Sequence, residues 1–74
     1  MAVSEAIDIL IAFEQSGVTR RAFERFMGRS YDGPWAVVSC DLLPSEDHSL
    51  NHIVEDAVTV IGSQHWNLIL AHPP

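Results

Sequence analysis

The chain is 74 residues long and 47% apolar, and its four Lys+Arg against ten Asp+Glu give a formal net charge of −6. This length leaves room for one small domain over residues 1–74, and the apolar fraction is too high for a disordered chain. All four cations are arginines between residues 20 and 29, so general binding of nucleic acid through a basic surface is not expected. The single cysteine allows no disulfide within the chain, and no apolar run approaches ~18 residues. We therefore expect a cytoplasmic protein without a membrane-spanning segment.

The first predicted element is a strand over residues 7–13, where apolar and β-branched side chains are typical of a strand buried on both faces of a parallel sheet. A polar turn at residues 14–17 separates this strand from a helix that we expect over residues 20–27. Thr19 is its predicted N-cap and Gly28 its stop. Four apolar side chains share one face of this helix and are expected to pack in the core: Ala22, Phe23, Phe26 and Met27.

A second apolar strand is predicted over residues 35–41, after a turn signal at residues 32–34. A strand, a helix and a strand in about 35 residues make a βαβ unit, whose right-handed crossover makes the two strands parallel neighbours. The polar segment that follows is expected to be a loop of unusual length. The remaining predictions are this loop at 42–52, a very short strand at 53–54, a short helix at 57–63 and a fourth strand at 67–71.

Polar residues follow the first three predicted strands at their carboxyl ends. They are the turn at residues 14–17, Asp41 and Asp56. Doubly wound sheets bind nucleotides at this edge, where a glycine such as Gly17 lets a ligand approach the backbone and a carboxylate such as Asp41 can accept hydrogen bonds from ribose hydroxyls. The spacing between Gly17 and Asp41 is close to the ~20 residues typical of such pairs. Together these features predict a nucleotide-type site.

Other chemistry receives less support from the residues. Cys40 lies in an apolar strand, which favours a buried thiol over an activated nucleophile. Ser16 and Ser39 lack a serine-hydrolase motif. A metal cluster in the loop is conceivable, but four placed zinc ligands are not expected in such a polar, flexible segment, so no metal site is predicted. The side chains in question are Glu46, Asp47, His48 and His52.

Several segments follow one another in a characteristic order: ILIAFEQSGV at 9–18 with RAF at 21–23, SCDLLP at 39–44, HI at 52–53 with DA at 56–57, and WNLILAHPP at 66–74. In this order they resemble the opening third of a phage and prophage family of DNA cytosine methyltransferases. The match breaks at residues 28–34 and 45–51. The resemblance implies an α/β fold with a partial Rossmann-like methyltransferase sheet, of about four mainly parallel strands in the order 3-2-1-4 with two short helices. It also implies S-adenosylmethionine as the cofactor.

The resemblance carries roles to individual residues. It places Asp41 at the ribose and Asp56 near the adenine amino group of the cofactor. The turn that would lie beside the methionine moiety contains Phe13, Glu14, Ser16 and Gly17. The start of the catalytic loop is matched by His72, Pro73 and Pro74. In the family the nucleophilic cysteine comes next, so we do not expect catalysis by these residues alone, and DNA is expected as a partner only within a larger enzyme.

The chain departs from the family pattern at two places, and the sequence is also compatible with two other functions. The turn after the first strand is poorer in glycine than the general methyltransferase pattern, and Asn67 stands where the family tends to have an acidic residue. The acidic charge also favours a small phage-type interaction or inhibitor protein, of the anti-restriction or anti-CRISPR kind, on a methyltransferase-derived fold. An uncovered sheet edge would favour a homodimer or a partner protein. The third possibility is a truncated domain of marginal stability without independent activity.

Overall fold

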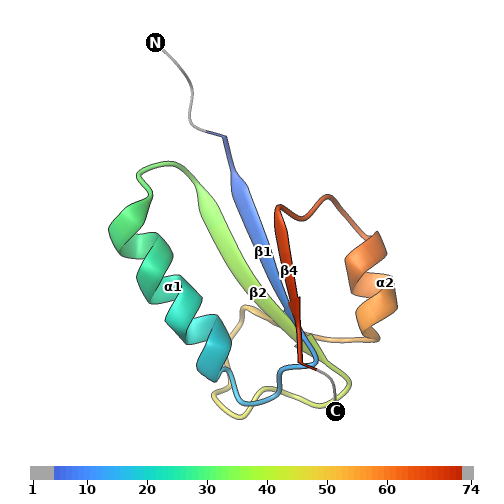
Figure 1. The fold of residues 1–74 in the computed structure, drawn as a ribbon. Coiled ribbons are helices and arrows are strands. Elements are labelled where there is room, and N and C mark those ends of the chain that lie inside the picture. The colour runs from blue at the N-terminus through green and yellow to red at the C-terminus, as the bar shows by residue number, and fades with distance from the viewer. Residues whose placement is uncertain (1–4, 73–74) are drawn as a thin grey trace.

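The computed structural model describes residues 5–72, which form a parallel sheet with one helix on each face (Figure 1). The first strand, the first helix and the second strand form the predicted βαβ unit, whereas the second and third strands are joined by a loop without a helix. The elements in order are β1 (Ile7–Ala12), α1 (Val18–Ser30), β2 (Trp35–Asp41), β3 (His52–Val54), α2 (Ala57–Gly62) and β4 (Leu68–Ala71).

The sheet has four strands in the order β3-β2-β1-β4, and every neighbouring pair is parallel. β1 lies in the interior of the sheet and pairs with β2 along its whole length, from Ile7 opposite Trp35 to Ala12 opposite Cys40. This confirms the predicted α/β class and the strand order 3-2-1-4. Since all strands run the same way, their carboxyl ends meet at one edge, the lower one in Figure 1.

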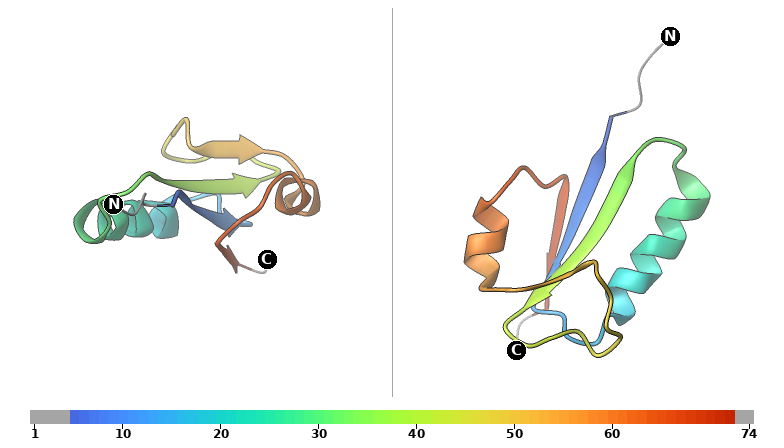
Figure 2. Two further views of the ribbon diagram at one scale, coloured as in Figure 1. Left: turned by 90° about the horizontal axis from the view of Figure 1, so that it is seen from above. Right: turned by 180° about the vertical axis from the view of Figure 1, so that it is seen from behind.

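The two faces of β1 build two separate cores, because successive side chains of a strand point to opposite sides. Leu10 and Ala12 pack beneath α2, while Ile9 and Ile11 pack beneath α1. Figure 2 shows the helices on opposite faces of the sheet. Residues 9–12 are all buried, which confirms the prediction of a strand covered on both faces.

α1 differs from its predicted bounds at both ends. It begins at Val18 rather than Arg20, and Thr19 does not cap it, because the carboxylate of Glu14 accepts the amides of Thr19 and Arg20 instead. It also continues through Gly28, so the predicted stop is wrong. The packing of Tyr31 and Trp35 against the core beneath α1 outweighs the weak helix propensity of one glycine.

The predicted inner face of α1 is correct for only part of its residues. Met27 is buried and Phe23 packs against the core, but Ala22 is exposed and Phe26 is 53% exposed. Arg20, at helical spacing from Phe23 and Met27, takes the inward position instead and is only 2% exposed. Hydrophobicity along the helix does not indicate that Arg20 is buried, because its polar partners Ser39 and Asp47 come from distant parts of the chain.

The second half of the chain follows the predictions within one residue at each end of an element. β3 begins at His52, α2 ends at Gly62 and β4 begins at Leu68. Asn67, just before β4, accepts the amide of Asp8 through Oδ1 at 2.7 Å and donates its own amide to the carbonyl of Asp8 at 2.8 Å. Its carboxamide therefore aligns β4 with β1. Within residues 5–72, no helix is long and apolar enough to cross a membrane.

Candidate functional site

A pocket of about 440 Å³ opens at the carboxyl edge of the sheet, in the place where the strand-end residues predict a site. Residues that follow all four strands line it. Its lining includes Phe13, Asp41, Leu42, Asp56, Ala57 and His72. Four of the residues predicted for the site, from four different strand ends, therefore lie around one cavity: Phe13, Asp41, Asp56 and His72.

The two aspartates of the pocket are oriented by their own backbone neighbourhoods. Oδ1 of Asp41 accepts the amide of Leu43 at 3.0 Å. Oδ2 of Asp56 caps α2 by accepting the amide of Thr59 at 3.2 Å. Within residues 5–72 no hydrogen bond reaches Asp41 Oδ2 or Asp56 Oδ1. Each carboxylate is thus held in place through one oxygen, while the other can accept a hydrogen bond from a ligand.

Phe13 has a backbone conformation that a bulky residue seldom adopts. Its φ is +61°, in the left-handed region that favours glycine, at a cost of about 1 kcal/mol or more. The backbone on either side is held by two hydrogen bonds, from Glu14 N to the carbonyl of Cys40 and from His72 N to the carbonyl of Ala12. This conformation places a 43% exposed ring against the pocket, and such strain is typical of functional sites.

The other predicted residues of the turn lie outside the pocket lining. Glu14 is 5% exposed and caps α1, with hydrogen bonds of 2.8 Å and 2.7 Å from the amides of Thr19 and Arg20. Ser16 accepts the amide of Val18 at 3.2 Å. Gly17 has a φ of +81°, and a Cβ at this position would lie 2.6 Å from Arg20 Nη2 and closer still to the carboxylate of Asp47. Pro73 and Pro74 lie outside the described residues.

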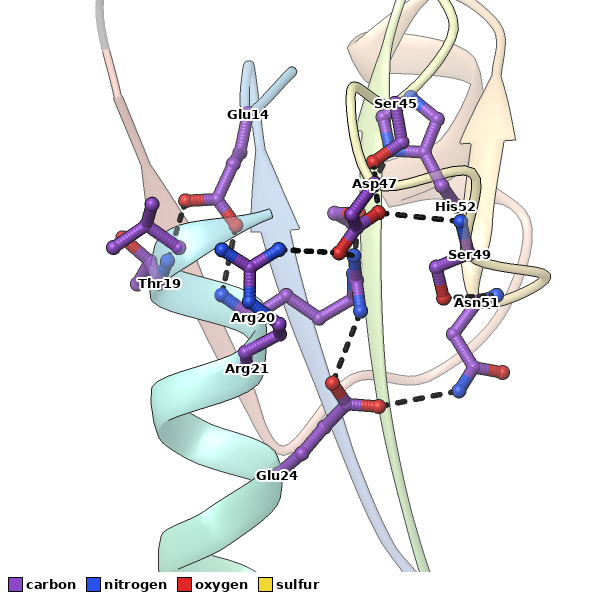
Figure 3. A network of polar contacts seen from close by, with 12 residues as sticks. Glu14, Thr19, Arg20, Arg21, Glu24, Ser45, Asp47, Ser49, Asn51 and His52 are labelled. Atoms are coloured by element: carbon purple, nitrogen blue, oxygen red, sulfur yellow. Dashed lines mark hydrogen bonds and ion pairs between the residues drawn. The ribbon is translucent and has the colours of Figure 1, made fainter. Parts of the chain in front are cut away.

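A buried arginine network lies beside this turn and was not predicted from the sequence (Figure 3). Arg20 donates from Nη1 to Glu24 at 3.0 Å, from Nε to Ser39 Oγ at 3.0 Å, and from Nη2 to Asp47. Arg21 donates to the same oxygen of Asp47 at 2.6 Å. The spacing of four between Arg20 and Glu24 is the only local signal of this network, since Asp47 joins it from a distant loop.

Asp47 is the centre on which the loop between β2 and β3 folds. It accepts the hydroxyl of Ser45 and the amide of Ser49, besides the two arginines. The Ser45 hydroxyl, then the guanidinium groups of Arg20 and Arg21, hold the pKa of the Asp47 carboxyl well below its usual range. The loop that the sequence predicts as long and irregular is therefore anchored to α1 by charge.

His52 anchors the same loop from its other end. Its Nδ1 lies 2.7 Å from Ser39 Oγ and its Nε2 lies 3.0 Å from the carbonyl oxygen of Leu43. Because Leu43 can only accept and Arg20 already donates to Ser39, we assign the hydroxyl of Ser39 as the donor to Nδ1 and Nε2–H as the donor to Leu43. Ser39 is fully buried, so its hydroxyl cannot reach a substrate, and both ring nitrogens of His52 are occupied by partners within the chain.

The cysteine and the loop residues considered as a nucleophile and as metal ligands do not form a reactive site among the described residues. Cys40 is fully buried in the core beneath α2, and burial raises the pKa of its thiol, which confirms the interpretation as a buried hydrophobe. In the part of the chain that the structure describes, no group of three or more His, Cys, Asp or Glu side chains could hold a metal ion. The pocket at the carboxyl edge is therefore the candidate site.

Comparisons of the chain with protein-family models, with curated proteins and with solved structures found no match. The case for a function therefore rests on the pocket and on the order of the motifs along the chain.

Proposed function

We propose that this chain is the cofactor-binding portion of an S-adenosylmethionine-dependent DNA cytosine methyltransferase, and that the pocket at the carboxyl edge binds the adenosyl part of the cofactor. The observation that supports this most is the meeting of Phe13, Asp41, Asp56 and His72 around one cavity. The first three are residues to which the family resemblance gives cofactor contacts, and His72 is where it begins the catalytic loop. The resemblance alone, not the pocket, supports DNA as the substrate.

The chemistry of the pocket fits an adenosyl group. Its volume of about 440 Å³ lies within the range of small-molecule sites, roughly 300–1,000 Å³. Phe13, Leu42 and Ala57 offer apolar surface for a purine ring. Asp41, Glu55 and Asp56 offer carboxylate acceptors for hydroxyl and amino groups. Donors and flat apolar surface are what a ribose and an adenine present.

In the proposed complex each residue has a distinct task. Asp41 accepts hydrogen bonds from the ribose hydroxyls through its second oxygen, and Asp56 accepts the adenine amino group. Phe13 and Leu42 pack against the ring and exclude water from it. S-adenosylmethionine supplies an activated methyl group when it is bound. His72 lies at the end of β4, where the pocket meets the segment that resembles a catalytic loop.

Calorimetric titration of the full chain with S-adenosylmethionine and with its demethylated product tests this proposal. We expect binding of both, and we expect Asp41→Asn to weaken it roughly tenfold or more, since a hydrogen bond to a charged group contributes about 1.5–3 kcal/mol. Asp32→Asn is the matched control, because it removes the same charge from an exposed residue before β2, at the opposite edge of the sheet. No heat at millimolar ligand, or equal affinity of Asp41→Asn and the unaltered chain, would contradict the proposal.

A second candidate function, an interaction protein, is favoured by the edge of the sheet. β4 is the last strand of the sheet, and its Leu68 and Ile69 are 41% and 39% exposed. Edge strands with exposed apolar side chains pair readily with other strands. On this ground we propose pairing of β4 with a second copy of the chain. Sedimentation over a range of concentrations should then show a dimer that Ile69→Lys abolishes. Val58→Lys on the exposed side of α2 should not affect it. A monomer throughout would argue against this function.

A further inference from the structure

The amino end of α1 holds two carboxylates of the chain itself, where anions of a ligand would otherwise bind. In dinucleotide-binding sheets the helix after the first strand binds a pyrophosphate with its first amides. Here the amides of Thr19 and Arg20 donate to Glu14 at 2.8 Å and 2.7 Å. The helix donors are thus already satisfied by a buried side chain.

The cationic groups beside this helix end are satisfied in the same way. Arg20 and Arg21 both donate to one oxygen of Asp47. Arginine pairs of this kind bind phosphate groups well, because their planar forks match the oxygens of the anion. Asp47 therefore takes the position that a phosphate oxygen would need, and it comes from the loop after β2.

The corner formed by Glu14, Gly17, Arg20 and Asp47 has no room for a further group. Glu14 and Arg20 are 5% and 2% exposed. Even a methyl-sized group on Gly17 would lie 2.6 Å from Arg20 Nη2. The loop is tied down over the turn, since Glu46 donates its amide to the carbonyl of Gln15 at 2.9 Å. A phosphate could enter only by displacing Asp47 and this loop.

We propose that Glu14 and Asp47 are internal anions that close the phosphate-binding corner of this sheet edge, so that the neighbouring pocket selects adenosine-type ligands without phosphate groups and rejects nucleotides. The identity of the ligand rests on the function proposed above, whereas the closure of the corner does not. The pocket adds to the selection, because the described residues that line it include Asp41, Glu55 and Asp56 and no lysine or arginine. Glu14 and Asp47 are thus specificity-determining residues that touch no ligand.

Titration of the full chain with inorganic pyrophosphate, adenosine and ADP tests the inference. The unaltered chain should bind adenosine and should bind ADP roughly tenfold or more weakly, and pyrophosphate should not raise its unfolding midpoint. Asp47→Asn removes the charge that ties the loop to Arg20 and Arg21, so that pyrophosphate can displace the loop, and the affinity for pyrophosphate should rise roughly tenfold. Equal binding of ADP and adenosine by the unaltered chain would overturn the inference, and this arm needs no variant.

Two controls separate the corner from the rest of the molecule. Asp47→Asn combined with Arg21→Gln should lose the gained pyrophosphate binding, because one of the two guanidinium groups is removed. Arg21 is chosen because its side chain is 43% exposed, whereas Arg20 is buried in the network. Asp32→Asn, which changes the net charge by the same amount, should gain none. If neither adenosine nor S-adenosylmethionine binds, the proposed function fails while the pyrophosphate arm still decides about the corner. A stable Asp47→Asn variant without any gain would then overturn the inference.

Discussion

Two parts of the same sheet edge use carboxylates in opposite ways. In the closed corner at the amino end of α1, the carboxylate oxygens of Glu14 and Asp47 accept hydrogen bonds from amides, a hydroxyl and arginines of the chain. In the pocket, Asp41 and Asp56 each bind one backbone amide and leave the other oxygen open. A carboxylate at a strand end is therefore available to a ligand only when the fold brings no donors to it.

The border between the two parts lies between adjacent residues. Phe13 faces the pocket and Glu14 faces the closed corner. The positive φ of Phe13 turns the backbone here, so that the side chain of Phe13 lies at the pocket while that of the next residue, Glu14, caps α1. If this contrast is correct, substitutions in the corner should cost stability and substitutions in the pocket should cost binding.

The largest effect is expected from Arg20→Met. The variant leaves Glu24, Ser39 and Asp47 without their shared donor, and breaking a buried pair by removing one partner costs about 3 kcal/mol. Urea unfolding followed by tryptophan fluorescence measures the loss. Arg25→Met, at an exposed position of the same helix, should stay within about 0.5 kcal/mol of the unaltered chain. Similar values for the two variants would mean that the network does not stabilise the fold.

Gly17→Ala should cost about 2 kcal/mol, because alanine is strained at a φ of +81° and its Cβ would collide with Arg20 and Asp47. Thermal unfolding of the variant is the measurement. The matched control is Gly62→Ala, where an added Cβ meets no atom within 4 Å, and no loss is expected there. An equal loss in the two variants would mean that the cost at Gly17 does not come from the closed corner.

The acid limb of the stability curve should depend on Asp47. Its carboxyl has a lower pKa in the folded chain than its value of about 3.9 in an unfolded one, so its contribution is present above about pH 4 and is lost as the pH falls further. Asp47→Asn should therefore unfold at a lower urea concentration at pH 7, with the difference from the unaltered chain shrinking below pH 4. A difference that is constant with pH would contradict the assigned ion pairs.

The smallest effect on stability is expected in the pocket. Asp41→Asn keeps an oxygen that accepts the amide of Leu43, so its free energy of unfolding should change by no more than about 0.5 kcal/mol while ligand affinity falls. The same urea experiment checks this value. A loss comparable with that of Gly17→Ala would place Asp41 among the structural carboxylates and would erase the contrast between the two parts.

Much of the fold could be predicted from local patterns. β2 has the predicted bounds, and β1, β3, α2 and β4 are each within one residue of prediction. These elements are short apolar runs bounded by polar turns, and the hydrophobic effect buries such runs regardless of which segments pack against them. The bounds of α1 were less predictable, because the cap comes from Glu14, outside the helix, and the continuation past Gly28 comes from packing with Tyr31 and Trp35.

The residues of the candidate site likewise divide into those that local patterns predict and those that depend on tertiary contacts. The sequence by itself determined that Asp41 and Asp56 lie at the carboxyl ends of parallel strands, at one edge of the sheet, because strand direction and chain order place them there. Only the tertiary structure decided that Glu14 is a helix cap and that Asp47 meets Arg20 and Arg21, 27 and 26 residues away along the chain. Those partners depend on how a loop without local regularity folds back over α1. Long-range pairing of charges has no period along the chain, and it emerges only when burial makes an unpaired charge too costly.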